Sequence, residues 1–425
     1  MRTWSSTLLN PTNGRRQHLV TKSWLWNLAG LVLIIGLATQ VSWGTLAFWH
    51  MSGASLLVGL VSFAYLVVVG VVLKLIRFPS TDKIAVVFLS VSIAFLFVLV
   101  IVVFGRFYYS RSFLLSAYLM SLVWLSIGVF LLSRYQRLTF GLVPGGFAER
   151  LLRLGGAEWV VLSSPRVQES LDGIVVDLHQ NLSPEWIRFL ADCSLRGIPV
   201  YHAALIYEHL TGRVSLEHLS DDAAQAFHLP LIYPHVKRFM DIILVLVSLP
   251  ITVPLMSMIA LLIKLDSRGP VLFIQDRVGQ GGRPFRMVKF RTMRTDAERG
   301  GAKFAEKADD RVTRLGRWLR KFRLDELPQF WNVLKGEMSL IGPRPEQVKF
   351  AAEFAKEIPY YNYRHLVKPG ITGWAQVMHG YAAGKKETQE KLEYDLYYVK
   401  YLSLWLDLLI IAKTIRTILT GFGAR

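Results

Sequence analysis

Four long runs of apolar residues open the sequence, and no other feature constrains the fold as strongly. The runs extend from Trp24 to Trp43, Ala54 to Leu73, Ile84 to Phe104 and Phe113 to Leu132, and each is nearly free of charge. Each has about the 20 residues that a helix needs to cross the hydrocarbon core of a bilayer. Aromatic residues flank the runs, as is typical of membrane interfaces. The sequence therefore predicts a four-helix transmembrane domain within residues 1–137.

Basic residues in the connections predict the orientation of these helices. They precede the first run, surround the second connection and follow the fourth run: Arg2, Arg15, Arg16, Lys22, Lys74, Arg77, Lys83, Arg134 and Arg137. The first connection has no Lys or Arg, and the third has only Arg106 and Arg111. Because short basic segments stay on the cytoplasmic side, the N-terminus and everything after Leu132 are predicted to face the cytoplasm.

The charge balance indicates an anionic partner. The chain has 49 Lys plus Arg against 31 Asp plus Glu, a formal net charge of +18, and 52% of its residues are hydrophobic. Such an excess suits nucleic acid, anionic lipid or phosphorylated substrates. The apolar content favours lipid and phosphates, and no nucleic-acid-binding motif is recognisable, so no nucleic-acid partner is expected. A single cysteine, Cys193, excludes an intrachain disulfide and a Cys-rich zinc site.

Residues 138–234 are compositionally soluble and predict a small Rossmann-like α/β module. Short apolar runs alternate with helical patterns such as Pro184 to Arg196, which favours a parallel sheet. The apolar runs are Phe140 to Val143, Trp159 to Leu162, Gly173 to Leu178 and Ile198 to Tyr201. Gly141, Gly145 and Gly146 form a glycine-rich turn but not the G-x-G-x-x-G fingerprint. A structural or regulatory module is favoured over a nucleotide site.

A fifth apolar run, Phe239 to Leu265, differs from the first four because Pro250 and Pro254 interrupt it. An interior proline removes a backbone hydrogen bond and bends a helix. If this run crossed the bilayer, the basic region after it would lie outside, against the charge rule. A re-entrant helix over residues 239–265 that bends at both prolines is therefore preferred to an ordinary span or a buried helix. The run from Tyr401 to Leu419 is mostly apolar but contains charged residues, a pattern that suits an interfacial amphipathic helix.

Four stretches beyond Ser267 supply candidate substrate ligands. Lys289 and Arg291 project from one face of a strand-like run, where they can grip a diphosphate or simply form an exposed basic edge. Prolines on both sides of Arg344 lower the entropic cost of holding it toward an anion. Gln376, in a turn-rich loop, and Asp395, on a polar and aromatic helix face, are substrate-binding candidates.

The stretch from Arg320 to Gln329 contains the acidic pair Asp325 and Glu326 ahead of Pro328. Pro328 fits the first turn of a helix, so Asp325 could simply cap that helix. Alternatively, two carboxylates at a positive helix end among arginines could gather Mg²⁺ and phosphates. The motif alone favours the capping interpretation.

The order of these motifs is more specific than any one of them. Lys237-Arg238-x-x-Asp241, KFRTM from Lys289, DELPQ from Asp325, GPRP from Gly342 and PGITGWAQ from Pro369 resemble the polyprenyl-phosphate phosphoglycosyl transferases, or bacterial sugar transferases. The resemblance covers about Val236 to the C-terminus. The preceding spans resemble the longer members of the family, which include glucose phosphotransferases.

The resemblance implies a mainly α (α+β) monotopic catalytic domain over residues 235–425, cytoplasmic and attached to the bacterial inner membrane by the re-entrant helix. It implies transfer of a sugar 1-phosphate from a UDP-sugar to polyprenyl phosphate. The sequence does not specify the sugar: glucose is the first choice, galactose the second and an N-acetylated sugar the third. UMP is released, and the reaction initiates exopolysaccharide, capsule or O-antigen synthesis. The acceptor and the lipid bilayer are the other expected partners, and a homo-oligomer is compatible with this assignment.

The resemblance also assigns roles to individual residues. Asp325 matches the nucleophile that forms an aspartyl sugar-phosphate intermediate, with Mg²⁺ required and Glu326 as its partner. Arg320 and Arg344 match family arginines and join Lys289 and Arg291 as candidate phosphate ligands. Two departures are Val253, where Ser is common before the bend, and Arg323, at a position that is often Ser. The alternative is a non-catalytic membrane scaffold for polysaccharide assembly.

Overall fold

The computed structural model describes residues 14–44, 46, 50, 53–75, 83–135, 138–166, 171–219, 227, 229–294, 311–379 and 385–420. The chain divides into two compact units, Met1–Thr211 and Gly212–Arg425, and each is described by itself. Arg2, Arg77 and Arg137, on which part of the predicted orientation depends, lie outside the described residues.

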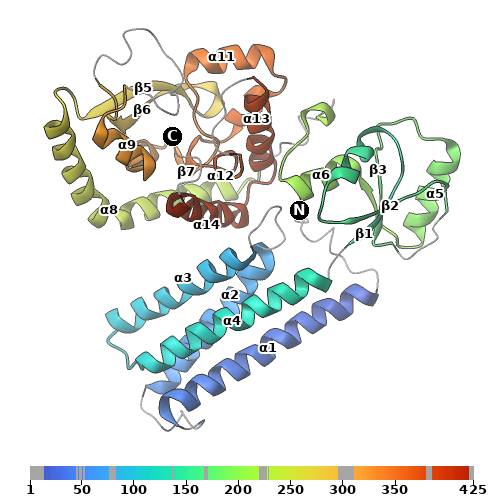
Figure 1. Ribbon diagram of the computed structural model, residues 1–425, viewed down its shortest axis with the longest axis horizontal. Helices are drawn as coiled ribbons and strands as arrows, with labels where there is room; N and C mark the ends of the chain where they lie inside the picture. The colour runs from blue at the N-terminus through green and yellow to red at the C-terminus, as the bar shows by residue number, and fades with distance from the viewer. Residues whose placement is uncertain are drawn as a thin grey trace. The chain divides into compact units, whose positions relative to one another are not determined.

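The first unit begins with four long helices that lie side by side (Figure 1). They are α1 (Gly14–Trp43), α2 (Ala54–Leu75), α3 (Lys83–Phe104) and α4 (Arg111–Tyr135). In lipid, a helix satisfies its backbone polar groups internally, which is why such apolar runs are helical. Among the described residues, five helices are long and apolar enough to cross a membrane, these four and α8 (Tyr233–Asp266). The predicted apolar segments are therefore long helices, whereas the number that span stays a prediction.

The contact between α1 and α4 is built from two tryptophans and two glycines. Trp26 stacks on Trp124 with the ring centroids 4.3 Å apart and the planes inclined by 19°. A Cβ atom on Gly30 would lie 2.1 Å from Nε1 of Trp124, and one on Gly128 would lie 2.6 Å from Nε1 of Trp26. Each indole thus occupies space that a side chain on the other helix would fill, and small residues allow close approach of helices in membranes.

The rest of the first unit contains a four-stranded parallel sheet in the order β2-β1-β3-β4. The strands are β1 (Thr139–Leu142), β2 (Glu158–Val161), β3 (Gly173–Val176) and β4 (Val200–His202), and the helices are η3 (Gly146–Arg153), α5 (Pro184–Leu195) and α6 (Ala203–Thr211). Side chains alternate between the two faces of a strand. Val175 packs with residues of η3 and α6, whereas Ile174 and Val176 pack with α5. The predicted parallel sheet is present.

Helix α8 begins the larger part of the second unit and is visibly bent in Figure 1. Pro250 and Pro254 lie inside it, and each removes one intrahelical hydrogen bond. The two halves of α8 pack against different apolar clusters. The first half contributes Val245 to a cluster with Met287, Val333 and Met338; the second contributes Ile259 and Ile263 to a cluster with Phe290 and Leu319.

The remainder of the second unit is mainly helical with two small sheets. β5 (Leu272–Val278) pairs antiparallel with β6 (Pro284–Phe290), and β7 (Ser339–Ile341) pairs parallel with β8 (Gly370–Thr372). The helices are η4 (Leu216–His218), η5 (Gln280–Gly282), α9 (Arg314–Lys321), η6 (Leu324–Glu326), α10 (Gln329–Lys335), α11 (Val348–Glu357), η7 (Tyr361–Leu366), α12 (Trp374–Met378), α13 (Lys385–Lys400) and α14 (Leu404–Thr420).

Polar contacts attach the first turns of α8 to this framework. Lys237 Nζ lies 2.6 Å from the Asp407 carboxylate on α14. Arg238 donates hydrogen bonds to the carbonyls of Val333 and Leu334, the latter at 2.8 Å, and so satisfies the C-terminal end of α10. The helix that carries the candidate membrane segment is thus joined to the short helix that follows the acidic pair.

Candidate active site

The acidic pair lies in a single turn, η6, that is buried between α9 and α10. Arg323 immediately before this turn adopts the left-handed conformation, with φ 53°. Residues other than glycine rarely adopt this conformation, and it is often found at functional sites. The N-cap of α10 is Pro328, so Asp325 does not cap that helix and the capping interpretation is wrong. The sharp turn instead places Asp325 and Glu326 side by side.

Glu326 is held by three cations. Nη2 of Arg344 donates to its Oε1 at 2.9 Å, and Lys289 Nζ lies 3.8 Å from the same oxygen. Nη1 of Arg323 lies 3.7 Å from Oε2. Although Oε2 is buried, it has no hydrogen-bond partner among the described residues. A buried acceptor without a partner is costly, which makes this oxygen a candidate ligand for a cation.

Asp325 is also buried, but it is held less firmly. Within the part of the chain that the structure describes, no hydrogen bond engages its carboxylate, whereas Lys289, Arg320 and Arg344 are close enough to act on its charge. Arg320 is itself fixed, because its Nε donates to Oγ1 of Thr292 at 2.9 Å. Of the two carboxylates, Asp325 is therefore the one that no hydrogen bond holds among the described residues.

Burial and the shared cations drive the two carboxyl groups in opposite directions. Burial and the neighbouring Glu326 raise the pKa of Asp325 to about 6. Burial alone would raise the pKa of Glu326, but Arg344, Lys289 and Arg323 lower it to about 2. Burial also lowers the pKa of Lys289 to about 8, assisted by Arg344 and opposed by Glu326. Separated pKa values in one cluster are typical of sites that divide chemical roles.

Three residues predicted to bind substrate lie elsewhere in hydrogen-bond networks of their own. Arg291 donates to the carbonyls of Ser267 and Arg268 at 2.8 and 2.9 Å, just after α8 ends. Gln376 donates to the Ile371 carbonyl at 3.1 Å, and its buried Oε1 has no partner among the described residues. Asp395 is 1% exposed and pairs with Arg364. The structure thus brings together Asp325, Glu326, Lys289, Arg320 and Arg344, and the substrate roles of the other three stay predictions.

Two further arginines join the network without having been predicted as ligands. Arg323 was noted only as a departure from the family pattern, yet its position two residues before Asp325 was a signal that it would lie nearby. Arg364 donates to the Arg344 carbonyl at 2.8 Å, and no local pattern in the sequence links these two residues.

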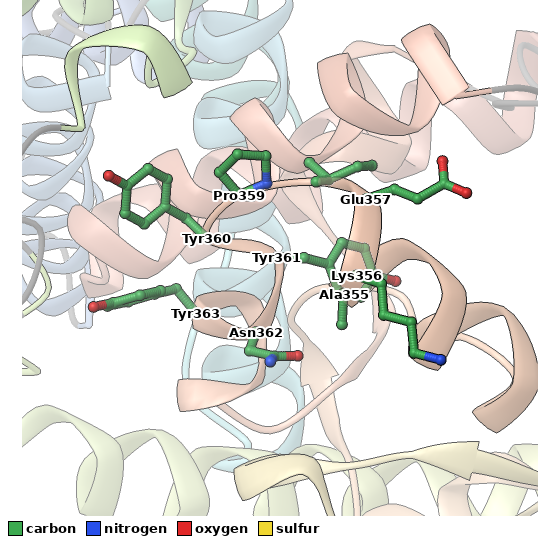
Figure 2. Close-up of a pocket in the computed structure, with 9 residues that line it drawn as sticks. Ala355, Lys356, Glu357, Pro359, Tyr360, Tyr361, Asn362 and Tyr363 are labelled. Atoms are coloured by element: carbon green, nitrogen blue, oxygen red, sulfur yellow. The ribbon is translucent and has the colours of Figure 1, made fainter.

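A hollow of about 330 Å³ lies at the turn after α11, and none of the residues that line it belongs to the acidic cluster. Figure 2 shows the rings of Tyr360 and Tyr363 extending the same way from this turn, with Lys356 on the other side. Because its lining comes from the single segment 355–363, this hollow does not collect side chains from several elements as the acidic cluster does.

In the α/β module, a carboxylate of the protein itself accepts a hydrogen bond from the backbone beside the glycine-rich turn. Oδ2 of Asp177, at the end of β3, accepts the Phe147 N–H at 2.8 Å at the start of η3. In nucleotide-binding folds this position, beside the switch in strand order, receives a phosphate. Because the Asp177 carboxylate already accepts this N–H, the N–H is not available to a phosphate, which favours the structural or regulatory interpretation of the module.

The donor set at the acidic pair fits a hard divalent cation. Mg²⁺ is bound by carboxylate oxygens together with substrate phosphates and water. Glu326 offers the buried Oε2 without a hydrogen-bond partner, and Asp325 offers a carboxylate beside it. The four cations around these two acids leave an excess of positive charge that suits a diphosphate.

Comparison with known proteins matches the second unit to one family. The family described as bacterial sugar transferase matches residues 232–421. A UDP-N-acetylgalactosamine-undecaprenyl-phosphate N-acetylgalactosaminephosphotransferase from Aeromonas hydrophila is 45% identical over 402 residues, which cover 93% of this chain and 94% of that protein.

Glucose-type relatives match over a shorter region. The UDP-glucose:undecaprenyl-phosphate glucose-1-phosphate transferase of Xanthomonas campestris pv. campestris is 46% identical over 181 residues, which cover 42% of this chain and 37% of that protein. The protein with the same description from Escherichia coli (strain K12) is 44% identical over 183 residues, or 42% and 39% of the two chains.

Proposed function

The chain belongs to the bacterial sugar transferase family, and from this premise we propose that it transfers a sugar 1-phosphate from a UDP-sugar to undecaprenyl phosphate and releases UMP. The observation that carries the proposal is the buried pair of Asp325 and Glu326, surrounded by cations and with one Glu326 oxygen left without a hydrogen bond. Such a transfer begins the synthesis of an exopolysaccharide, capsule or O-antigen on the membrane.

In the first step a carboxylate oxygen of Asp325 attacks the β-phosphorus of the UDP-sugar. A new O–P bond forms, the bond from that phosphorus to the bridging oxygen breaks, and UMP leaves with the bridging oxygen and its electron pair. Lys289, Arg320 and Arg344 stabilise the charge that develops on the phosphate oxygens. Asp325 suits this role because no hydrogen bond within the described residues ties up its carboxylate.

In the second step an oxygen of undecaprenyl phosphate attacks the phosphorus of the aspartyl sugar phosphate. The Asp325–phosphorus bond breaks, the carboxylate is restored, and the sugar is left on a polyprenyl diphosphate. Dividing one transfer into two allows a soluble donor and a lipid acceptor to use the same cations in turn. Glu326 stays ionised throughout, because Arg344, Lys289 and Arg323 hold its pKa near 2.

Asp325 and Glu326 are the residues that would hold Mg²⁺. When bound, the ion neutralises charge on the diphosphate and assists departure of UMP. Arg344 donates to Oε1 of Glu326, so Oε2 would be the oxygen that this residue offers to the metal. The side chain of Glu326 thus orients the site, and Asp325 performs the substitution.

The donor sugar is open between two candidates supported by different observations. Glucose is the first choice from the resemblance of the motifs to the family, and the glucose-type relatives match 42% of this chain. The Aeromonas hydrophila relative, which matches 93% of the chain, is described as an N-acetylgalactosaminephosphotransferase. UDP-glucose and UDP-N-acetylgalactosamine are therefore the first donors to test. UMP release is measured with these two and with a panel that also includes UDP-galactose and UDP-N-acetylglucosamine.

The membrane setting of the proposed reaction follows from α8. Its apolar side chains Val247, Ile251 and Leu265 are each more than 70% exposed in the protein alone, and such a surface is stable only in contact with lipid or another protein. We propose that α8 enters the inner membrane, bends at Pro250 and Pro254, and returns to the cytoplasmic face. The catalytic residues then stay in the cytoplasm.

Cysteine accessibility tests this orientation. Single cysteines replacing Arg15, Ser163 and Ala424 in a Cys193→Ser background should all be shielded from an impermeant thiol reagent in intact cells. Labelling at position 424 with protection at 163 would mean that α8 spans the bilayer and that the re-entrant proposal is wrong.

The covalent mechanism is tested with donor labelled in the β-phosphate. Purified protein without lipid acceptor should gain one labelled sugar phosphate and release one UMP, and addition of undecaprenyl phosphate should discharge the adduct. A protein that binds other polysaccharide-assembly proteins but forms no adduct and releases no UMP from any donor would instead support the non-catalytic scaffold.

A further inference from the structure

The loop that carries Arg344 is fixed through four consecutive backbone carbonyls. Each accepts a hydrogen bond from a residue that is distant in sequence. The bonds run from Gly370 N to Pro343 O at 3.0 Å, from Arg364 Nη2 to Arg344 O at 2.8 Å, from Arg277 Nη1 to Pro345 O at 3.1 Å and from Val278 N to Glu346 O at 2.9 Å. A short loop whose consecutive carbonyls are all hydrogen-bonded has little freedom, so these donors fix the backbone from which the Arg344 side chain extends.

Arg364 is the donor that acts on Arg344 itself. Its Nη2 donates both to the Arg344 carbonyl and to Oδ2 of Asp395, each at 2.8 Å, and its Nη1 donates to the Tyr361 hydroxyl at 2.8 Å. The planar guanidinium presents these donors in a fixed fork. One side chain therefore links α13, η7 and the loop whose arginine meets Glu326.

Asp395 lies too deep to contact substrate directly in this structure. It is 1% exposed, and Arg364 is 3% exposed. Burying an ion pair is expensive, and removing one partner leaves an uncompensated charge. A buried pair beneath a loop whose carbonyls are all hydrogen-bonded is suited to holding that loop in place. An exposed ion pair would contribute little to the stability of the loop.

We propose that Arg364 and Asp395 are positioning residues that hold the backbone of Arg344, so that its guanidinium meets Glu326 and the substrate phosphates. Asp395 fixes the Arg364 fork, and Arg364 in turn fixes the Arg344 carbonyl. The expected effect of this pair on turnover rests on the proposed function. Its effect on the placement of the loop can be measured without any substrate.

A double-mutant cycle tests whether Asp395 acts through Arg344. Asp395→Asn keeps the shape of the side chain and removes its charge. In the full-length protein in nanodiscs, we expect it to lower kcat for UMP release by about ten-fold or more. In an Arg344→Ala background the same change should lower kcat by less than about two-fold, because the arginine that it positions is already gone. If Arg344→Ala is too slow to measure, Arg344→Lys provides the second background.

Glu390→Gln is the matched control. Glu390 lies on the same helix, α13, and pairs with His379 at 3.0 Å and Arg213 at 3.8 Å, away from the Arg344 loop. This change should leave kcat unchanged. If Asp395→Asn does not fold, Arg364→Lys takes its place, since it retains the charge but lacks the planar fork.

Hydrogen exchange measures the stability of the loop that carries Arg344, and it requires neither substrate nor turnover. In Asp395→Asn the Gly370 amide, which donates to Pro343, should exchange faster than in the wild type, whereas in Glu390→Gln it should not. Equal losses of kcat in both backgrounds, or unchanged exchange at Gly370, would overturn the proposal. If the wild type releases no UMP from any donor, the proposed function fails, and the exchange result alone decides the positioning role.

Discussion

Asp177 in the α/β module and Glu326 in the second unit are both buried carboxylates, with 3% and 5% of their surfaces exposed, but the fold treats them differently. Both oxygens of Asp177 accept backbone N–H groups, from Phe147 at 2.8 Å and His179 at 3.0 Å. Glu326 has one oxygen on Arg344, and the other has no hydrogen-bond partner among the described residues.

The two carboxylates thus differ in their hydrogen bonding: each oxygen of Asp177 has a partner, whereas one oxygen of Glu326 has none among the described residues. Buried polar groups are nearly always satisfied, so an unsatisfied one calls for an explanation such as an absent ion. At Asp177 the backbone supplies a partner for each oxygen, and His202 Nε2 also lies 3.6 Å from Oδ1, so the side chain connects the end of β3 to the start of η3. At Glu326 the missing partner is the place for a ligand. Four predictions test this contrast.

The largest effect is expected from Asp325→Asn. Asparagine is nearly isosteric with aspartate but is a poor nucleophile, so turnover should fall by about a thousand-fold or more, while the protein still inserts and binds UDP-sugar. UMP release and adduct formation measure the loss. Near-normal turnover in this variant would show that Asp325 is not the nucleophile.

Glu326→Gln should have the next largest effect. The amide keeps the volume but loses the charge that would hold the metal, so the Mg²⁺ concentration for half-maximal turnover should rise by about 10- to 100-fold. A titration of UMP release against Mg²⁺ measures this shift. An unchanged Mg²⁺ dependence would mean that the Oε2 of Glu326 is not a metal ligand. The absence of a hydrogen bond at this oxygen would then not distinguish Glu326 from Asp177 in function.

The pH dependence of turnover should show an acid limb near 6. Burial and Glu326 raise the pKa of Asp325 to about 6, and an attacking carboxylate must be ionised. Turnover should therefore fall as the pH drops through 6, by about ten-fold for each further unit. Because metal and proton compete for the same oxygens, more Mg²⁺ should move the limb to lower pH. A limb near 4, the ordinary value for aspartate, at every Mg²⁺ concentration would contradict this assignment.

Asp177→Asn should have the smallest effect on chemistry. Only one of its two backbone hydrogen bonds can be retained, which should cost about 1.5 to 3 kcal/mol of local stability. Turnover per folded molecule should stay within about two-fold of the wild type, given that no predicted catalytic residue lies in the module. Hydrogen exchange in β1 and β3 measures the stability, and UMP release measures the turnover.

Asp172→Asn provides the comparison for Asp177→Asn. Its carboxylate accepts the Thr139 N–H at 2.9 Å through Oδ2, and the side-chain oxygen of an asparagine can accept the same bond, so its loss of stability should be smaller. If Asp177→Asn lowered turnover as much as Glu326→Gln, the module would take part in catalysis and the contrast between the two carboxylates would be broken.

The sequence predicts best those features that depend on residues close together in the chain. Long apolar runs became α2 and α3 because a helix satisfies the backbone polar groups of such a segment within the segment itself. Short apolar runs became β1 to β4 within about two residues of their predicted bounds. Asp325, Glu326 and Arg320 are neighbours in one stretch and were noted for that reason, whereas the resemblance of the motif order to the family was needed to assign the pair a catalytic role.

Contacts between distant segments were not predictable from these patterns. Lys289 and Arg291 are two residues apart and were expected to act together, but β6 ends at Phe290 and Arg291 bonds with Ser267 instead. The link from Arg364 to Asp395 joins positions 31 residues apart. Nothing in the local chemistry of either segment specifies the other, so only the tertiary fold reveals the pair.

The packing of Trp26 and Trp124 against Gly128 and Gly30 has a consequence for how this sequence can change. Each large ring fits only because the facing position lacks a side chain, and helices in lipid recognise one another by shape more than by hydrophobicity. A larger residue at either glycine would displace the opposite indole, and only a simultaneous reduction of that indole would restore the fit. Across related chains these four positions should therefore covary as two pairs.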